Sequence, residues 1–216
     1  MRTKSPMKGL LRYSAYAASG NASITLFAAV ALAVVFLATG NQFFFNMLVL
    51  CALIIFPMIV IGVMGMGNWE RFQLTMPVRR DTLLTMQYLS IILCAFIGVA
   101  LVAITAGAGY ALGISGLFDD GMMELTLNTV PALGMPFLMA GVVFPLASTK
   151  RGQEMATGIL TTSQFITIGV VMLTPWAASR FDVSLQVIGL WVVAMSMVAF
   201  VGSYFVTRML YAKLDF

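Results

Sequence analysis

The placement of charge along this 216-residue chain limits its fold more than any other feature. Its 12 basic and 8 acidic residues all lie outside six long apolar stretches. A membrane-spanning helix needs about 20 mostly apolar residues, because the bilayer core has no water to satisfy backbone polar groups. Charged residues make up 9% of the chain, against roughly 25% in a soluble domain. The sequence therefore predicts an all-α polytopic membrane protein with a single domain over residues 1–216.

The six apolar stretches are predicted to be transmembrane helices at residues 22–40, 44–66, 90–113, 127–147, 156–176 and 185–207. Lys and Arg gather before the first stretch, between the second and third, between the fourth and fifth, and after the last. Only Arg180 lies on the opposite side. Because cytoplasmic loops are rich in Lys and Arg, both termini are predicted to be cytoplasmic.

Residues 6–20 are predicted to form a short interfacial helix that begins at Pro6. Leu10 and Tyr13 lie on its apolar side, and Lys8 and Arg12 on its basic side. A plain orientation signal is the alternative reading of this segment. The net charge of +4 indicates membrane orientation and contact with anionic lipid, and we expect no nucleic-acid partner.

The chain lacks the residue types that several catalytic and metal-binding functions require. It has no histidine, no Asp or Glu within the apolar stretches, and no G-x-x-x-x-G-K-[ST] phosphate loop. These absences argue against Ser–His hydrolysis, a histidine-bound metal, intramembrane proteolysis and ATP hydrolysis by the chain itself. We therefore expect no catalytic residue, metal or cofactor on this chain, and we expect another subunit to drive any transport.

The most specific local pattern lies in the second cytoplasmic loop, where residues 68–76 are predicted to form a short amphipathic helix. Trp69, Phe72 and Met76 fall at helical spacing on one face. Pro77 then ends the helix, because the residue before a proline is disfavoured in the α conformation. The next helix is predicted to start near Asp81, before the membrane. An interfacial anchor is the alternative reading of the short helix, since Trp and Arg commonly lie at the headgroups.

Residues 69–81, with Tyr88, resemble the cytoplasmic loop of small ABC-2-type exporter permeases, in which an aromatic stretch leads to a Leu-Pro-Val-Ser-Arg turn. The C-terminal residues 211–216, Tyr-Ala-Lys-Leu-Asp-Phe, are similar to that family's Tyr-x-Lys-x-Asp-Phe ending. Six apolar stretches and the chain length also fit. Arg79 stands where the family usually has Ser, and Gln87 stands where Lys is common.

The resemblance implies a multi-pass permease of the bacterial cell membrane that exports an amphipathic or hydrophobic substrate, such as an antimicrobial peptide, toxin, drug or lipid. It implies two ABC ATPase subunits, which bind the ATP and Mg, and a second permease chain that is identical or a sister chain. Residues 68–76 are then the coupling helix. The implied coupling residues are Trp69, Glu70, Arg71, Phe72, Met76, Pro77, Arg79 and Arg80, and the implied secondary contact is made by Lys150, Arg151 and Glu154.

Within the predicted spans, polar and helix-breaking residues follow recognisable patterns. Polar residues at helical spacing in the fifth stretch indicate a helix interface, the dimer seam or a wall of the substrate path; they are Thr157, Thr161, Gln164 and Thr167. Pro57 predicts a kink in the second stretch, and prolines in the fourth predict a kink or a hinge. Gly109 and Gly113 match the G-x-x-x-G motif for close helix packing.

Two other functions stay open at this stage. One is a substrate-capture subunit of an energy-coupling-factor vitamin importer, whose ATPase contact would run through another membrane protein. The other is a non-transporting peptide immunity protein, which would protect cells without ATP hydrolysis. Direct binding of an ATPase by the loop around Trp69 separates the permease from both.

Overall fold

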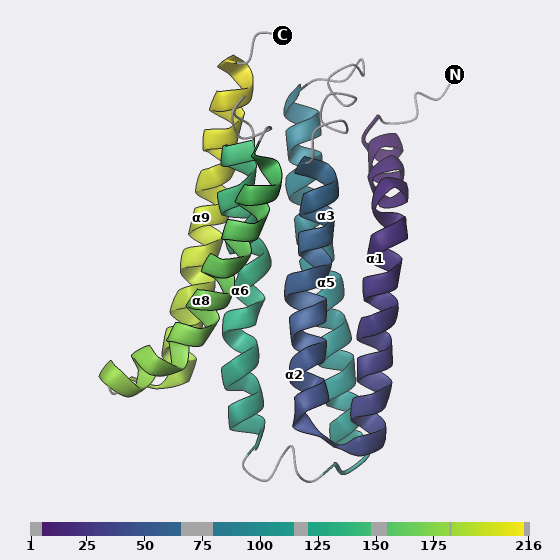
Figure 1. Ribbon diagram of the computed structural model, residues 1–216, viewed down its shortest axis with the longest axis vertical. Helices are drawn as coiled ribbons and strands as arrows, with labels where there is room; N and C mark the ends of the chain where they lie inside the picture. The colour runs from purple at the N-terminus through teal and green to yellow at the C-terminus, as the bar shows by residue number, and fades with distance from the viewer. Residues whose placement is uncertain (1–5, 66–79, 115–120, 148–154, 182, 214–216) are drawn as a thin grey trace.

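A computed structural model describes residues 6–65, 80–114, 121–147, 155–181 and 183–213, and all regular structure in these ranges is helical. The helices run side by side in an elongated bundle, with the start of the first and the end of the last at the same end (Figure 1). They are α1 (Pro6–Thr39), α2 (Gln42–Leu50), the π-helical turn η1 (Cys51–Ile55), α3 (Phe56–Gly65), α5 (Arg80–Ala111), α6 (Gly121–Ala147), α8 (Ala156–Phe181) and α9 (Leu185–Lys213).

By length and composition, three described segments can cross a membrane: Gln42–Ile61, Asp81–Ala111 and Gln186–Leu210. Ser23–Thr39 and Ala132–Ala147 are shorter apolar helices. The predicted all-α membrane class is therefore confirmed. Each predicted span overlaps one helix or the continuous run from α2 to α3, while the number of membrane crossings stays a prediction.

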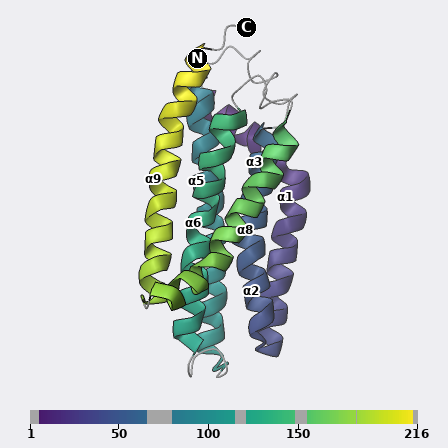
Figure 2. The same cartoon turned by 60° about the vertical axis from the view of Figure 1, so that its left-hand side comes forward.

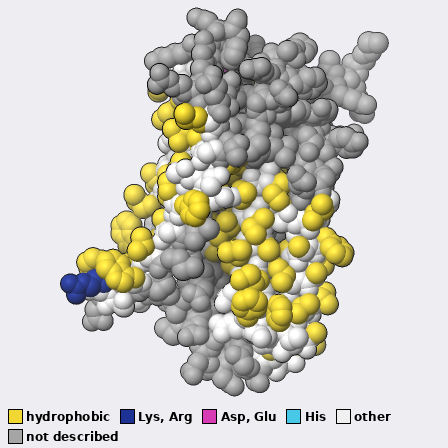
Figure 3. Space-filling view, in the orientation of Figure 1, with side chains coloured by type: hydrophobic (Ala, Val, Ile, Leu, Met, Phe, Trp, Pro, Cys, Tyr) yellow, Lys and Arg dark blue, Asp and Glu magenta, His cyan; other side chains and the backbone are white. Residues whose placement is uncertain are grey.

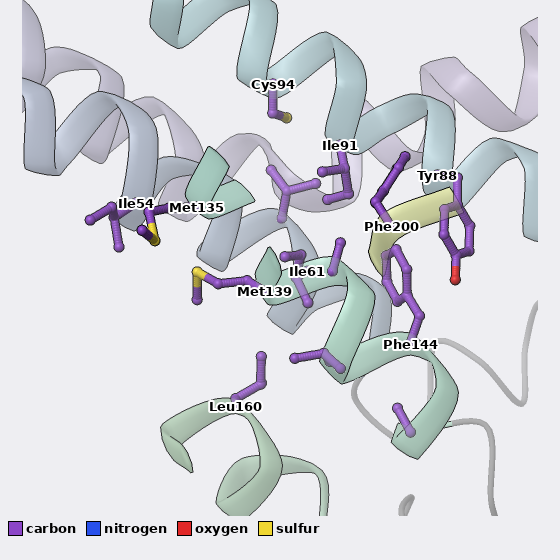
Figure 4. Packing of buried hydrophobic residues seen from close by; sticks show 14 of the residues in the cluster. Ile54, Ile61, Tyr88, Ile91, Cys94, Met135, Met139, Phe144, Leu160 and Phe200 are labelled. Carbon is purple, nitrogen blue, oxygen red and sulfur yellow. The ribbon is translucent and has the colours of Figure 1, made fainter. Parts of the chain in front are cut away.

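Two clusters of buried apolar side chains hold the bundle together. One cluster joins α1, α2, η1 and α5 to Ala132 of α6, and includes Phe36, Phe45 and Leu48. The other joins η1, α3, α5, α6, α8 and α9, with Met135 and Met139 of α6 among its fully buried members (Figure 4). Within the described chain, α6 and α9 form the most extensive helix pair. Figure 1 shows an α1–α2–α3–α5 group beside an α6–α8–α9 group, and the second cluster joins the two groups.

Helix α1 differs from the expectation for the N-terminal region. It begins at Pro6, as predicted, but continues for 34 residues, about 51 Å, without a break. Residues 6–20 are therefore the first part of α1 and not a helix of their own. The sequence around Gly20 is rich in alanine, the strongest helix former, and contains no proline that would interrupt the backbone hydrogen bonds. The position of this segment at the membrane surface stays a prediction.

A glycine with positive φ follows the helix in two of the predicted spans. Gly40 follows α1 with φ of 65°, and Asn41 then caps α2 by accepting a hydrogen bond from the Phe43 N–H at 2.9 Å. Gly113 follows α5, also with φ of 65°. Of the two glycines that match the G-x-x-x-G motif, Gly113 has open space, since an added Cβ would meet no atom within 4 Å. Gly109 does pack closely, against the ring of Phe36.

Pro57 was predicted to kink its helix, and the structure has a π-helical turn, η1, directly before it. Proline has no N–H, and its ring crowds the carbonyl four residues earlier, which here belongs to Leu53. The helix widens just before it, so that the Phe56 N–H bonds to the Cys51 carbonyl, five residues earlier. Gly98 of α5 lies directly against this turn: a Cβ at Gly98 would be 2.5 Å from the Ala52 carbonyl oxygen. By contrast, α6 stays helical through all its prolines.

Candidate functional site: the polar seam between α5 and α9

Polar side chains join α5 to α9 at the end of the bundle where α5 begins. On α5 they recur at positions i, i+4 and i+7, which lie on one face of a helix. We call this set the α5–α9 seam; its members are Asp81, Thr85, Tyr88, Ser203, Tyr204, Thr207 and Arg208.

Tyr88 is the buried centre of the seam. Its hydroxyl oxygen lies 2.9 Å from the Ser203 Oγ and 3.0 Å from the Thr207 Oγ1, and all three residues are buried. Ser203 donates its hydrogen to the Phe200 carbonyl at 2.7 Å. Because each hydroxyl has one hydrogen, Tyr88 must donate to Ser203, and Thr207 must donate to Tyr88. The hydrogen bonds therefore run in one direction through four residues, an arrangement in which each bond strengthens the next.

Aromatic packing extends this contact to a third helix. The Tyr88 ring centroid lies 4.9 Å from that of Phe144 on α6 and 4.9 Å from that of Phe200 on α9 (Figure 4). Tyr204 approaches edge-on at 5.2 Å. Tilted and edge-on rings at these separations attract one another beyond simple area burial. Tyr88 thus fixes α5 to α9 by hydrogen bonds and to both α6 and α9 by ring contacts.

The seam becomes more exposed toward the start of α5. Thr85 donates to the Asp81 carbonyl at 2.8 Å, so the Tyr204 hydroxyl, 3.2 Å away, must donate to Thr85. At the end, the Arg208 guanidinium donates to both carboxylate oxygens of Asp81, at 3.1 and 3.4 Å. Both of these side chains are more than half exposed, and such a pair contributes less than about 1 kcal/mol. The ion pair therefore adds little to the stability of the contact between α5 and α9.

We expect Tyr88→Phe to lower the free energy of unfolding by about 1 kcal/mol, because two hydroxyl contacts between membrane helices are lost while the ring packing stays. Unfolding of the purified protein in mild detergent measures this loss. Tyr204→Phe is the control, since it removes one longer bond from a half-buried residue and should cost less. An equal loss of unfolding free energy in both variants would contradict the role of Tyr88 as the buried centre of the seam.

Most of the predicted coupling residues lie outside the described part of the chain. This holds for Trp69, Glu70, Arg71, Phe72, Met76, Pro77 and Arg79, and for the secondary contact Lys150, Arg151 and Glu154. Arg80 is the first residue of α5, and the helix start predicted near Asp81 is confirmed. The seam therefore begins directly after the predicted coupling segment along the chain.

The polar residues predicted on the fifth stretch do not share one environment. Thr167 is almost fully buried and donates to the Ser163 carbonyl at 2.7 Å, whereas Thr161 is exposed. The half-buried Gln164 donates its amide to the Met58 sulfur, where α8 meets α3. Thr157 lies in the first turn of α8. Of the four, Thr167 lies at a helix interface and Gln164 at the contact between the two helix groups.

Sequence reasoning missed the α9 side of the seam. Ser203 and Thr207 are four residues apart within an apolar helix, a spacing that places two hydroxyls on one face. That spacing indicates a polar face on the helix, but it does not identify the residue that the two hydroxyls contact. Tyr88 stood out only through the resemblance, and only the packing of α5 on α9 brings it to these hydroxyls.

Comparison with known proteins agrees with a membrane transport component. The sequence matches a family described as ABC-2 family transporter protein over residues 13–212. Neither the curated proteins nor the solved structures contain a significant match to the chain.

Proposed function

Because the chain belongs to the ABC-2 family of transporter proteins, we propose that it is the permease subunit of an ATP-binding cassette exporter. In this proposal the chain crosses the bacterial cell membrane six times, with both termini in the cytoplasm. Two ABC ATPase subunits bind ATP and Mg, and a second permease chain, identical or a sister, completes the transporter. The chain itself breaks no covalent bond.

The observation that carries the proposal is the position of the α5–α9 seam. Helix α5 has 32 residues, about 48 Å, and so exceeds the roughly 30 Å apolar core of a bilayer. Its first residue, Arg80, follows the predicted coupling segment. Tyr88 then ties it to α9 and, through Phe144, to α6. A displacement of the coupling segment would therefore move α5, α9 and α6 together.

The proposed coupling segment has the residue types that such a contact needs. Closure of two ATPases on ATP is a rigid-body motion, which requires a stiff element to push against. Trp69 and Phe72 supply the aromatic residue types that often dominate interface energy. Glu70, Arg71 and Arg79 supply rim charges that set register and partner choice.

The proposed substrate is amphipathic or hydrophobic, such as an antimicrobial peptide, toxin, drug or lipid. The predicted spans contain no charged residue that would bind an ion or a strongly polar solute. In the described bundle, Met58 and the fully buried Met135 and Met139 lie where the two helix groups meet. Methionine is flexible and polarisable, so it suits an adaptable apolar path. Gln164, beside Met58, is the proposed polar contact on that path.

The test is co-purification with the ATPase encoded nearest to this chain. We expect the double variant Trp69→Ala, Phe72→Ala to weaken ATPase binding at least about tenfold, because aromatic anchors often contribute 2 kcal/mol or more. The measurement is the amount of ATPase, and its ATP hydrolysis, recovered through a tag on this chain in mild detergent.

Trp191→Ala is the matched control, because it removes an exposed tryptophan from α9, which lies outside the proposed coupling contact. It should leave ATPase recovery unchanged. Unchanged recovery with the double variant, from a well-folded sample, would refute the coupling role. Recovery of no ATPase even with the natural sequence would favour the importer-subunit or immunity functions.

A further inference from the structure

The C-terminal part of α8 leaves the bundle. Its lower end bends outward, and its turn into α9 stops short of the lower ends of α2 and α6 in both views (Figures 1 and 2). Pro175 lies in this part of the helix, and a proline removes one backbone hydrogen bond and bends a helix. Two large apolar side chains that follow are exposed: Trp176 is 60% exposed and Phe181 is 69% exposed.

A cation lies on this uncovered segment. Arg180, in the last turn of α8, is exposed, and within the described part of the chain it forms no ion pair. It lies four residues after Trp176 and so on the same face of the helix. The space-filling view shows a positively charged side chain at this end of α8 with hydrophobic side chains beside it (Figure 3). Tryptophan beside a cation is typical of the headgroup level of a membrane.

An apolar hollow lies on the first turns of α9, just after this corner. Its volume is about 290 Å³, and it is lined by Val187, Leu190, Trp191 and Ala194. These residues are spaced i, i+3, i+4 and i+7, so they form one face of the helix. Leu190 and Trp191 are both more than 60% exposed. The hollow can therefore take an extended hydrocarbon chain from the surrounding lipid.

We infer that the corner between α8 and α9 binds an anionic phospholipid of the outer leaflet. The Arg180 guanidinium holds the phosphate through paired N–H donors, and an acyl chain lies in the hollow of α9. A guanidinium close to the apolar layer is costly unless it is paired. A free phosphate would use only Arg180 and leave the adjoining hollow empty. The assignment to the outer leaflet rests on the orientation in the proposed function.

The experiment measures phosphatidylglycerol retained by the purified full-length chain, without any ATPase, by native mass spectrometry in detergent. Arg180→Gln should lower retention about fivefold, the effect of one basic side chain near an anionic surface. Arg180→Lys should keep most of it, because the charge stays. Arg208→Gln, a change in a cation that is already paired with Asp81, should leave retention unchanged. Equal retention by natural and Arg180→Gln proteins would overturn the inference, and so would equal losses in both Gln variants.

Two further measurements identify the ligand. Excess inorganic phosphate should not displace phosphatidylglycerol, and displacement would overturn the lipid assignment in favour of a phosphate site. Leu190→Ala should lower retention of long-chain lipid more than that of a short-chain analogue, because it removes part of the hollow; equal effects would overturn the acyl-chain role. Since no ATPase takes part, a failed lipid experiment is distinguishable from a failed permease proposal.

Discussion

Gly98→Ala is expected to lower the free energy of unfolding by about 3 kcal/mol, the upper end of the usual cost of overpacking. The added Cβ would lie 2.5 Å from the Ala52 carbonyl oxygen and 3.0 Å from the Leu53 Cδ2. A leucine side chain can rotate away, but the carbonyl is held in the π turn before Pro57. Alanine favours a helix over glycine by about 1 kcal/mol, which is too little to offset the separation of α5 from η1.

Gly107→Ala is the matched control, because Gly107 lies in the same helix and an added Cβ there would meet no atom within 4 Å. It should be neutral or slightly stabilising. Thermal or denaturant unfolding of both variants in the same detergent measures the difference. Equal stability of the two variants would show that α5 does not press on the π turn.

Gly134→Val is expected to destabilise the protein by about 2–3 kcal/mol, through the interface between α6 and α9. A Cβ at Gly134 would lie 3.0 Å from the Ser196 Oγ and 3.1 Å from the Val193 Cα. The Val193 contact is with backbone, so the two helices must move apart. This is the most extensive helix pair of the described bundle, and small residues let such backbones approach closely.

The control is Gly202→Val on α9, since Gly202 is exposed and a Cβ there would meet nothing within 4 Å. Gly134→Ala should give an intermediate loss, because its single methyl group requires a smaller shift. The three unfolding free energies in one detergent test this order. A Gly202→Val protein as unstable as Gly134→Val would show that valine in a helix, and not the close approach, causes the loss.

Local features of the fold were readable from the sequence where a single residue sets the backbone. Gly40 takes a positive φ, and Asn41 caps the helix after it, so the end of α1 and the start of α2 follow from two adjacent residues. The start of α5 was also predicted near Asp81. The helix boundary expected after residue 20 is absent, because α1 continues from Pro6 to Thr39. A change from charged to apolar residues does not break the backbone hydrogen bonds of a helix.

The candidate site was only partly predictable. The coupling residues around Trp69 were recognised by local pattern and by resemblance, and they lie outside the described residues. The polar face expected on α8 divides between exposed Thr161 and buried Thr167, since the neighbours of α8 determine which side is covered. The partners of Tyr88 are more than a hundred positions away, so no local pattern could name them.

By itself, the sequence determined the membrane class, the helical content and the positions of the apolar stretches. These follow from the cost of burying charge and unpaired backbone groups in hydrocarbon, a cost that each segment bears alone. Only the tertiary structure decided that Gly98 meets the π turn, that Gly134 meets α9, and that Tyr88 meets Ser203 and Thr207. Such contacts depend on which helices are neighbours and at what rotation, and both come from the packing of the whole bundle.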